Sequence, residues 1–201
     1  MADEKRPYRK RARAAHEEET RRRITESAVH LHGTVGPAHA SISAIAEHAG
    51  VRRSTVYRHF PDEAALFAAC SGHWRNANPP PDLAAWADIA DPGERLRTAL
   101  EDVYGWYRQT EPMLTNLLRD ATAVPLVGEL LGAGYGVFLA AAADVLMAGR
   151  RARGRARRRV QAAIGHALAV TTWRSLACEQ GLKDPEAAEL MCALVAAATL
   201  N

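Results

Sequence analysis

Residues 41–60 read SISAIAEHAGVRRSTVYRHF, and this stretch decides how the whole chain is interpreted. Two helices that cross tightly need a small residue where their axes approach, a residue that tolerates positive φ in the turn, and a branched apolar residue that holds the second helix in place. Ala46, Gly50 and Val56 meet these three needs, at spacings of four and six residues. The stretch therefore predicts a helix-turn-helix.

The second helix of this motif would project Arg53, Ser54, Thr55 and Tyr57 outward. Side chains of these types donate hydrogen bonds to base edges in the major groove or to phosphate oxygens. Residues 1–13 add six basic side chains against two acidic ones, which suits an anionic partner. The N-terminal part of the chain accordingly predicts double-stranded DNA as a partner.

The remaining sequence predicts an all-α fold. Ala, Leu, Arg and Glu are common, and no run of β-branched or aromatic residues alternates with period two. We expect the first helix to begin near Glu17, and we expect Asp91 and Asp184, each followed by proline, to be N-caps. Three ion pairs should support the first helix: Glu17–Arg21, Glu18–Arg22 and Glu19–Arg23. The other expected helices cover residues 41–49, 53–59, 62–74, 91–107, 111–121, 125–148, 157–180 and 184–200.

Residues 76–82, NANPPPD, separate two predicted domains. Three consecutive prolines lack the amide hydrogens that a helix requires, so this stretch cannot be helical. We therefore predict a basic flexible arm over residues 1–16, a helix-turn-helix domain over residues 17–75 and a larger helical domain over residues 76–201.

The composition excludes several classes of protein. Hydrophobic residues make up 48% of the chain and charged residues 24%, as in ordinary globular domains. Three cysteines, Cys70, Cys178 and Cys192, cannot form a disulfide framework, which favours a cytoplasmic location. The N-terminus lacks the apolar stretch of a secretory signal. The apolar stretch 131–149 contains four glycines and Asp144, so we interpret it as a buried helix and expect no membrane contact.

No metal site, cofactor or catalytic centre is predicted. His30 and His32 are two residues apart and cannot share a helical face, whereas Cys70 and His73 can share one but supply only two ligands. The sequence shows no paired carboxylates, glycine-rich phosphate loop or catalytic triad. We therefore expect no enzymatic activity.

A dense basic cluster lies in the second domain, where residues 150–159 include seven arginines. The rest of residues 75–201 holds seven basic and fourteen acidic residues. We interpret the cluster as a solvated loop that partly compensates the C-terminal dipole of the helix ending near Gly149. An acidic partner is the alternative.

Residues 20–74 resemble the DNA-binding domain of the TetR family of transcriptional regulators. The family's small residue, Gly-Val turn and Tyr-x-His-Phe ending appear as Ile45-Ala46, Ala49-Gly50-Val51 and Thr55-Val56-Tyr57-Arg58-His59-Phe60. The resemblance implies a homodimeric repressor that a small-molecule effector, bound in the C-terminal domain, releases from a palindromic operator. The alternative is a small-molecule-binding helical protein whose N-terminal domain contacts a protein partner.

The resemblance also assigns DNA contacts to individual residues. Arg52 stands where the family often has a serine that caps the recognition helix, and Glu63 stands where it commonly has a phosphate-binding lysine. A carboxylate there is favourable for the helix dipole but repels phosphate. The expected DNA contacts are Ser43, Arg52, Arg53, Ser54, Thr55, Tyr57, Arg58 and His59.

In the family, the helices of the second domain enclose the effector pocket, and the last two helices pack against those of a second subunit. Aromatic residues at helical spacing and apolar stripes also suit an internal core, and this alternative stays open. The expected pocket residues are Trp106, Tyr107, Met113, Leu117, Leu131, Tyr135, Phe138 and Trp173, with Asp144, Gln161 and His166 as polar anchors. The expected dimer-interface residues are Leu168, Thr171, Leu190, Leu194, Val195 and Ala198.

Overall fold

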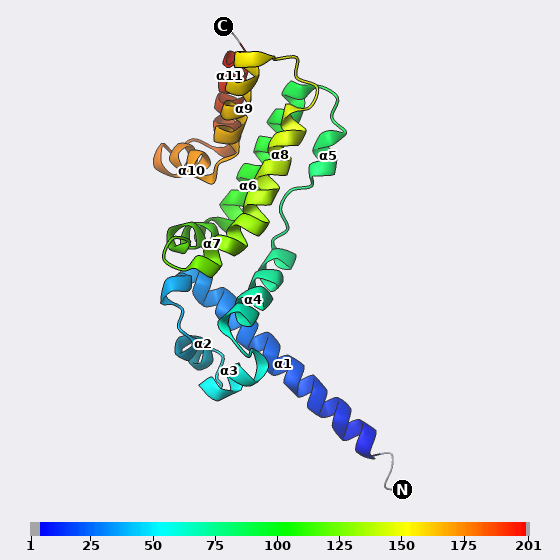
Figure 1. Ribbon diagram of the computed structural model, residues 1–201. Helices are drawn as coiled ribbons and strands as arrows, with labels where there is room; N and C mark the ends of the chain where they lie inside the picture. The colour runs from blue at the N-terminus through cyan, green and yellow to red at the C-terminus, as the bar shows by residue number, and fades with distance from the viewer. Residues whose placement is uncertain (1–4, 200–201) are drawn as a thin grey trace. The chain divides into compact units, whose positions relative to one another are not determined.

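The computed structural model describes residues 5–199, and for residues 5–9 it describes the backbone alone. Most of the described part of the chain is helical and it contains no strand, so the all-α prediction is confirmed (Figure 1). The chain divides into two compact units. The N-terminal unit holds the described residues up to Pro79 together with Pro112–Gly128, and the C-terminal unit holds Pro80–Glu111 and the described residues from Glu129 onward. The sequence had assigned all of 76–201 to one domain.

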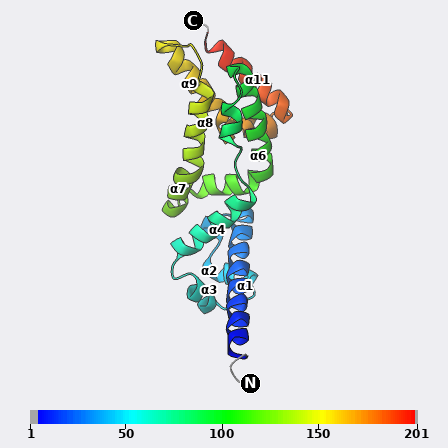
Figure 2. The same ribbon diagram turned by 90° about the vertical axis from the view of Figure 1, so that its right-hand side faces the viewer.

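Helix α1 (Lys5–Thr34) is longer than predicted. It begins at Lys5 and not near Glu17, so the described part of the predicted flexible arm is helical. Residues with high helix propensity fill this region, and Arg13 forms an ion pair with Glu17 one turn later, at 3.1 Å. In both views the N-terminal turns of α1 project beyond α2 and α3 (Figures 1 and 2).

The helix-turn-helix lies beside α1 and comprises α2 (Ile42–His48) and α3 (Arg53–His59). A short 3-10 turn, η1 (Pro37–His39), precedes it, and α4 (Glu63–Ala77) follows it. Ser41 Oγ accepts a hydrogen bond from the Ala44 amide at 3.1 Å, and Asp62 Oδ1 accepts one from the Ala65 amide at 2.7 Å. These side chains cap α2 and α4, so both helices begin where the sequence predicts. The core residues of this unit include Ile24, Ala28, Ile45, Val56, Phe60 and Leu66.

After the short helix α5 (Leu83–Ala87), a long helix α6 (Pro92–Asp120) contributes residues to both units. As predicted, Asp91 caps it, with Oδ1 accepting hydrogen bonds from the amides of Gly93 and Glu94. The separate helix predicted over 111–121 is wrong, because α6 continues through Pro112. Proline inside a helix removes one backbone hydrogen bond, and here the buried residues Met113 and Leu114 hold the helix together beyond it.

Helix α7 (Pro125–Leu131), the π-helical turn η2 (Gly132–Gly136) and α8 (Val137–Met147) follow one another without a break. Within residues 5–199, this is the one helix that is long and apolar enough to cross a membrane by length and composition. Its prediction as a buried helix is only partly right. Leu146 and Met147 are buried, but Val137 is 60% exposed.

The last segment comprises α9 (Gly154–Leu168), α10 (Val170–Trp173), the π-helical turn η3 (Arg174–Glu179) and α11 (Asp184–Ala197). A single helix over 157–180 is therefore wrong, because Ala169 has an extended ψ of 131° and interrupts it. The N-cap of α11 is Lys183 and not Asp184. Instead, Asp184 accepts hydrogen bonds from Arg108 at 2.6 Å and from Trp173 at 2.9 Å.

Candidate nucleic-acid interface

The turn between α2 and α3 has the geometry that its sequence predicts. Gly50 has a φ of +64°, in the left-handed region that favours glycine. The Val51 amide donates to Ala46 O at 2.9 Å, which ends α2, and the side chain of Ala46 is buried. Val56 is 1% exposed and holds α3 against the core. The motif therefore fixes the direction in which α3 leaves the unit.

Two arginines of α1 hold α3 and the turn in place. The guanidinium of Arg21 donates to His59 O at 2.7 Å and lies 4.2 Å from the centre of the Phe60 ring. The guanidinium of Arg23 donates to Ala49 O, just before the turn. Both contacts join residues that are distant in the sequence, so periodicity gave no signal for them.

The ion pairs predicted within α1 are consequently wrong. Arg21 and Arg23 reach the backbone of the helix-turn-helix, and Arg22 pairs with Glu19 at 2.7 Å and with Glu26 at 2.6 Å. The pairing follows the direction each side chain takes on α1. Arg22 points into solvent, while its neighbours face the motif.

The outer surface of α3 presents most of the predicted DNA contacts. Tyr57 is 41% exposed, and its hydroxyl accepts a hydrogen bond from Arg53 at 3.2 Å. Arg52 is the N-cap of α3 but forms no side-chain cap, so its guanidinium stays available. Thr55 is half-buried. The other exposed members of the predicted set are Ser43 on α2 and Ser54 and Arg58 on α3.

His59 differs from the rest of the set. Its Nε2 atom is buried and has no hydrogen-bond partner among the described residues. Burial lowers the pKa of this imidazole, and the nearby Arg58 lowers it further. The backbone carbonyl of His59 accepts the hydrogen bond from Arg21, and a contact between its side chain and DNA stays a prediction.

A polar clamp joins the C-terminal end of α6 to the segment after α1. We define the clamp as Asn116, Arg119 and Asp120. Asn116 Nδ2 donates to the last carbonyls of α1, His32 O at 3.0 Å and Gly33 O at 2.9 Å. These carbonyls lack partners within the helix, so the amide side chain satisfies them.

The other two clamp residues bind the loop before η1. Asp120 Oδ2 accepts from the Ala38 amide at 3.0 Å, and Arg119 Nη2 donates to Val35 O at 2.9 Å. The Arg119 guanidinium also bonds to Asp120 and lowers the pKa of that carboxyl group. Between them lies Gly36, with φ 92° and ψ 157°. No local sequence pattern indicates this clamp, because its partners are more than eighty residues apart.

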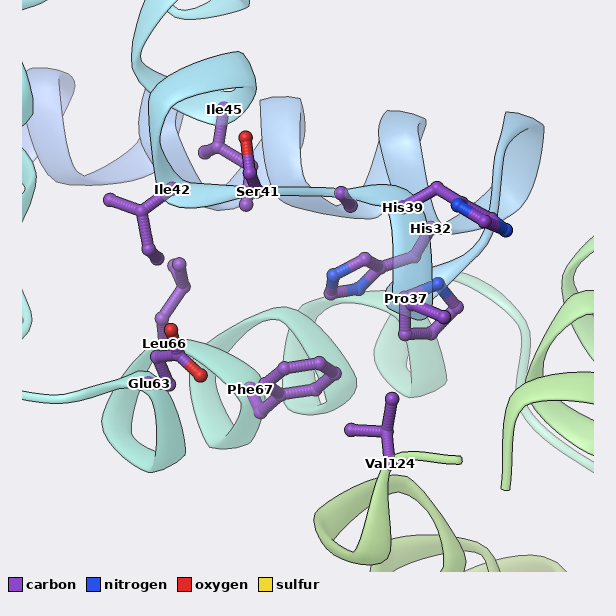
Figure 3. A pocket seen from close by; sticks show the side chains of 12 residues that line it. His32, Pro37, His39, Ser41, Ile42, Ile45, Glu63, Leu66, Phe67 and Val124 are labelled. Atoms are coloured by element: carbon purple, nitrogen blue, oxygen red, sulfur yellow. The ribbon is translucent and has the colours of Figure 1, made fainter. Parts of the chain in front are cut away.

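A cavity of about 280 Å³ opens in the N-terminal unit, where no pocket was predicted (Figure 3). The imidazole of His32 stacks on Phe67 with ring centres 4.7 Å apart, and its Nδ1 lies 3.6 Å from the Sγ atom of Cys70. Burial lowers the pKa of His32 to about 4, so the ring is neutral near pH 7. Pro37, Ile42, Glu63, Leu66 and Val124 are among the other lining residues (Figure 3). Within the described residues, no group of three metal-ligating side chains comes together.

The C-terminal unit contains three hydrogen-bonded tyrosines, of which Tyr104 and Tyr107 are buried and Tyr135 is half-buried. The break after Leu168 leaves the last carbonyls of α9 without helical partners. Tyr107 Oη donates to Leu168 O at 2.6 Å, and Tyr104 Oη donates to Ala167 O at 2.8 Å. Because the proton of Tyr107 is used in this way, the Tyr135 hydroxyl, 2.8 Å away, is the donor to Tyr107 Oη. Burial raises the pKa of all three tyrosines.

Ring contacts connect five of the eight predicted pocket residues into an aromatic cluster: Trp106, Tyr107, Tyr135, Phe138 and Trp173. Tyr135 lies in the π-helical turn η2, a local distortion that is frequent at functional sites. Leu131 is half-buried at the end of α7. Met113 and Leu117 belong to the N-terminal unit, where Met113 lies beside Gly33. The proposed polar anchors Asp144, Gln161 and His166 are exposed.

The predicted dimer-interface residues divide into buried ones and exposed ones. Leu168 and Val195 are at most 1% exposed and belong to the core of the C-terminal unit, so they cannot reach a partner. Leu190 and Leu194 are 46% and 42% exposed on one face of α11. Thr171 is exposed and Ala198 half-buried.

Residues 24–70, from the middle of α1 into α4, match the sequence model of the family described as bacterial regulatory proteins, tetR family. These residues form a TetR-family DNA-binding domain. No curated protein matches the sequence. The matched residues include the whole helix-turn-helix, so the motif on which the TetR-family resemblance rested is confirmed, and the chain is a DNA-binding transcriptional regulator.

Solved structures of TetR-family proteins have a similar fold. A TetR-like transcriptional regulator from Rhodococcus sp. RHA1 is 22% identical, with 88% of this chain and 93% of that chain covered and a TM-score of 0.61. A tetR-family regulator from Streptomyces coelicolor is 23% identical (90% and 79% covered, TM-score 0.52). One from Haloarcula marismortui ATCC 43049 is 14% identical (90% and 97% covered, TM-score 0.55). The likeness extends the TetR-family fold over both units.

Proposed function

We propose that this regulator is a repressor, which binds a palindromic operator as a homodimer and leaves it when a small effector binds in the C-terminal unit. The observation that carries the proposal is the surface of α3. Its polar and basic side chains point outward, while Val56 and Arg21 hold the helix from behind and Arg23 holds the turn before it. A helix held in this way can enter a major groove without rearrangement.

In this proposal, Arg53, Ser54 and Tyr57 read base edges, and Ser43, Arg52, Thr55 and Arg58 contact the nearby backbone and bases. Arginine reads guanine through two hydrogen bonds, and hydroxyl groups accept or donate to several bases. Two copies related by a twofold axis require half-sites about 34 Å apart, or a multiple of that distance.

The aromatic cluster is the proposed effector site. Aromatic side chains with few polar groups are typical of small-molecule sites. Tyr107 and Tyr135 already share a hydrogen bond, so an effector with a polar group can replace it while its apolar part packs on the rings. Leu190 and Leu194 of α11 are the proposed centre of the dimer interface, because both are large, apolar and exposed.

Helix α6 is the proposed connection between effector and DNA binding. It carries Tyr107 of the aromatic cluster and, further along, the clamp that holds the loop before η1. A shift of α6 on effector binding would move this loop, from which α2 begins. A coupling free energy of about 1 to 3 kcal/mol is enough to change operator affinity about 5- to 150-fold.

Selection of bound duplexes from a random library tests the proposal. We expect a palindrome to be enriched, and we expect Arg53→Ala to lose discrimination at one symmetric pair of positions while it retains binding to the rest. Enrichment of a site without twofold symmetry, or an unchanged site preference in Arg53→Ala, would contradict the proposal. A protein partner as the true target of the N-terminal unit would yield no enriched sequence at all.

A further inference from the structure

The arginine cluster predicted as a solvated loop contains two arginines that are engaged within the chain, Arg150 and Arg159, and five that are not. Arg150 is structural, because its guanidinium donates to Leu146 O at 2.8 Å and to Pro92 O at 2.7 Å, which closes the turn between α8 and α9. We define the basic patch as five other arginines that are exposed and form no ion pair or side-chain hydrogen bond within residues 5–199. They are Arg151, Arg153, Arg155, Arg157 and Arg158.

The position of the basic patch is unfavourable for the isolated chain. Arg153 is the N-cap of α9 without a side-chain cap, and the first turn contains no acidic residue. The N-terminus of a helix carries partial positive charge, so cationic side chains there oppose the dipole. Since no carboxylate of the described chain neutralises the patch, an external anion would relieve this repulsion.

The composition of the patch indicates which anion fits. Residues 150–159 contain only arginine, alanine and glycine. A membrane-binding segment needs large apolar side chains to insert, and the centre of a protein interface needs aromatic or aliphatic anchors. Single-stranded nucleic acid is bound by stacking on aromatic rings. A partner recognised by guanidinium groups alone is a regular array of phosphates.

The dimensions agree with a DNA strand. Residues 151–153 have no regular secondary structure, with an extended backbone at Arg153, and 154–158 are helical, so the patch reaches at most roughly 15 to 20 Å. One strand of a duplex presents a phosphate about every 3.4 Å along the axis, so several phosphates lie within this length. Outside the cluster, residues 75–201 hold fourteen acidic residues against seven basic ones. Contact with a polyanion is therefore confined to the patch.

We propose that the basic patch of the C-terminal unit binds the phosphate backbone of double-stranded DNA without regard to sequence. This second DNA contact is separate from α3. It goes beyond the proposed function, in which the N-terminal unit alone meets DNA, and it does not depend on an effector or an operator.

The test uses the full chain with the α3 surface silenced by Arg52→Ala, Arg53→Ala and Arg58→Ala. Binding to a fluorescent duplex of random sequence is measured by anisotropy between about 50 and 200 mM salt. In this background, Arg151→Ser with Arg155→Ser removes two charges from the patch. The matched control, Arg75→Ser with Arg97→Ser, removes two exposed charges from elsewhere.

We expect the silenced protein to retain salt-dependent binding. The patch variant should reduce the slope of log affinity against log salt by about 1.8, because each phosphate contact contributes about 0.9. The control pair should leave the slope unchanged, and Arg151→Lys with Arg155→Lys should restore it. Helical circular dichroism confirms that each variant folds.

Three results would overturn the inference: no duplex binding by the silenced protein, an equal loss in the patch and control variants, or tighter patch-dependent binding to phosphatidylglycerol vesicles or polyglutamate than to the duplex. If the variant with Arg151→Ser and Arg155→Ser does not fold, the variant with Arg151→Lys and Arg155→Lys still tests the inference. Loss of binding in that folded lysine variant would contradict a contact based on charge.

Discussion

Substitution of Gly36 by alanine tests the clamp at the end of α6. The backbone at Gly36, with φ 92° and ψ 157°, lies in a region that is essentially restricted to glycine. A side chain at this position would also overlap the terminal atoms of Arg119 and Asp120. Arg119 is about half exposed and can move away, but the Asp120 side chain is 5% exposed and cannot move without losing its bond to the Ala38 amide.

The expected cost follows from these contacts. The unfavourable backbone conformation costs about 1 to 3 kcal/mol. Leaving the buried Asp120 carboxylate without the Ala38 amide as its partner costs about 1 to 3 kcal/mol more. The lower entropy of unfolded alanine returns about 0.4 to 1 kcal/mol. We therefore expect Gly36→Ala to lower the free energy of unfolding of the N-terminal unit by about 1 to 6 kcal/mol.

Urea unfolding followed by circular dichroism measures the change, and amide hydrogen exchange locates it. Gly72→Ala is the matched control, because Gly72 lies inside α4 with no atom within 4 Å of its added methyl group. That substitution should stabilise the unit by about 0.5 to 1 kcal/mol through helix propensity. If the two alanine variants unfold at the same urea concentration, or if Gly36→Ala leaves the protection of α2 and α4 intact, the clamp does not hold this loop.

Three further predictions concern the N-terminal unit. The pKa of His32 is about 4 in the folded state and about 6.5 in the unfolded state. Between these pH values the unfolded state binds more protons than the folded state. The free energy of unfolding should therefore fall by about 3 kcal/mol as the pH drops from 6.5 to 4. In His32→Gln this part of the pH dependence should disappear, and urea unfolding with the same slope in both proteins would refute the assignment. Arg21→Ala should destabilise the unit by about 1 to 3 kcal/mol and weaken DNA binding, since it removes a charged hydrogen bond to the end of α3. Arg22→Ala removes only exposed ion pairs and should have a much smaller effect than Arg21→Ala. An equal effect of the two substitutions in thermal melts and gel-shift assays would contradict the role of Arg21. Glu63→Lys should tighten binding to all duplexes alike and steepen the salt slope by about 0.9. Unchanged or weaker binding in salt titrations would show that the first turn of α4 does not approach phosphate.

Features that depend on neighbouring residues were predictable from the sequence. The turn at Gly50 needs a positive φ, and the caps Ser41, Asp62 and Asp91 bond to amides two or three residues away. The helix-turn-helix, and with it the family, rests on these local requirements. The outward direction of Arg53 follows from the same helical geometry, because Val56 fixes which side of α3 faces the core.

Features that depend on distant contacts were decided by the tertiary structure. α6 continues through Pro112 because Met113 and Leu114 are buried, and α9 ends at Leu168, where its free carbonyls accept hydrogen bonds from tyrosines sixty residues away. Leu168 joined the core while Leu190 stayed exposed, although both fit the same apolar pattern. Periodicity shows that a helix has an apolar face but not what covers it, because the free energy gained depends on which surface that face meets.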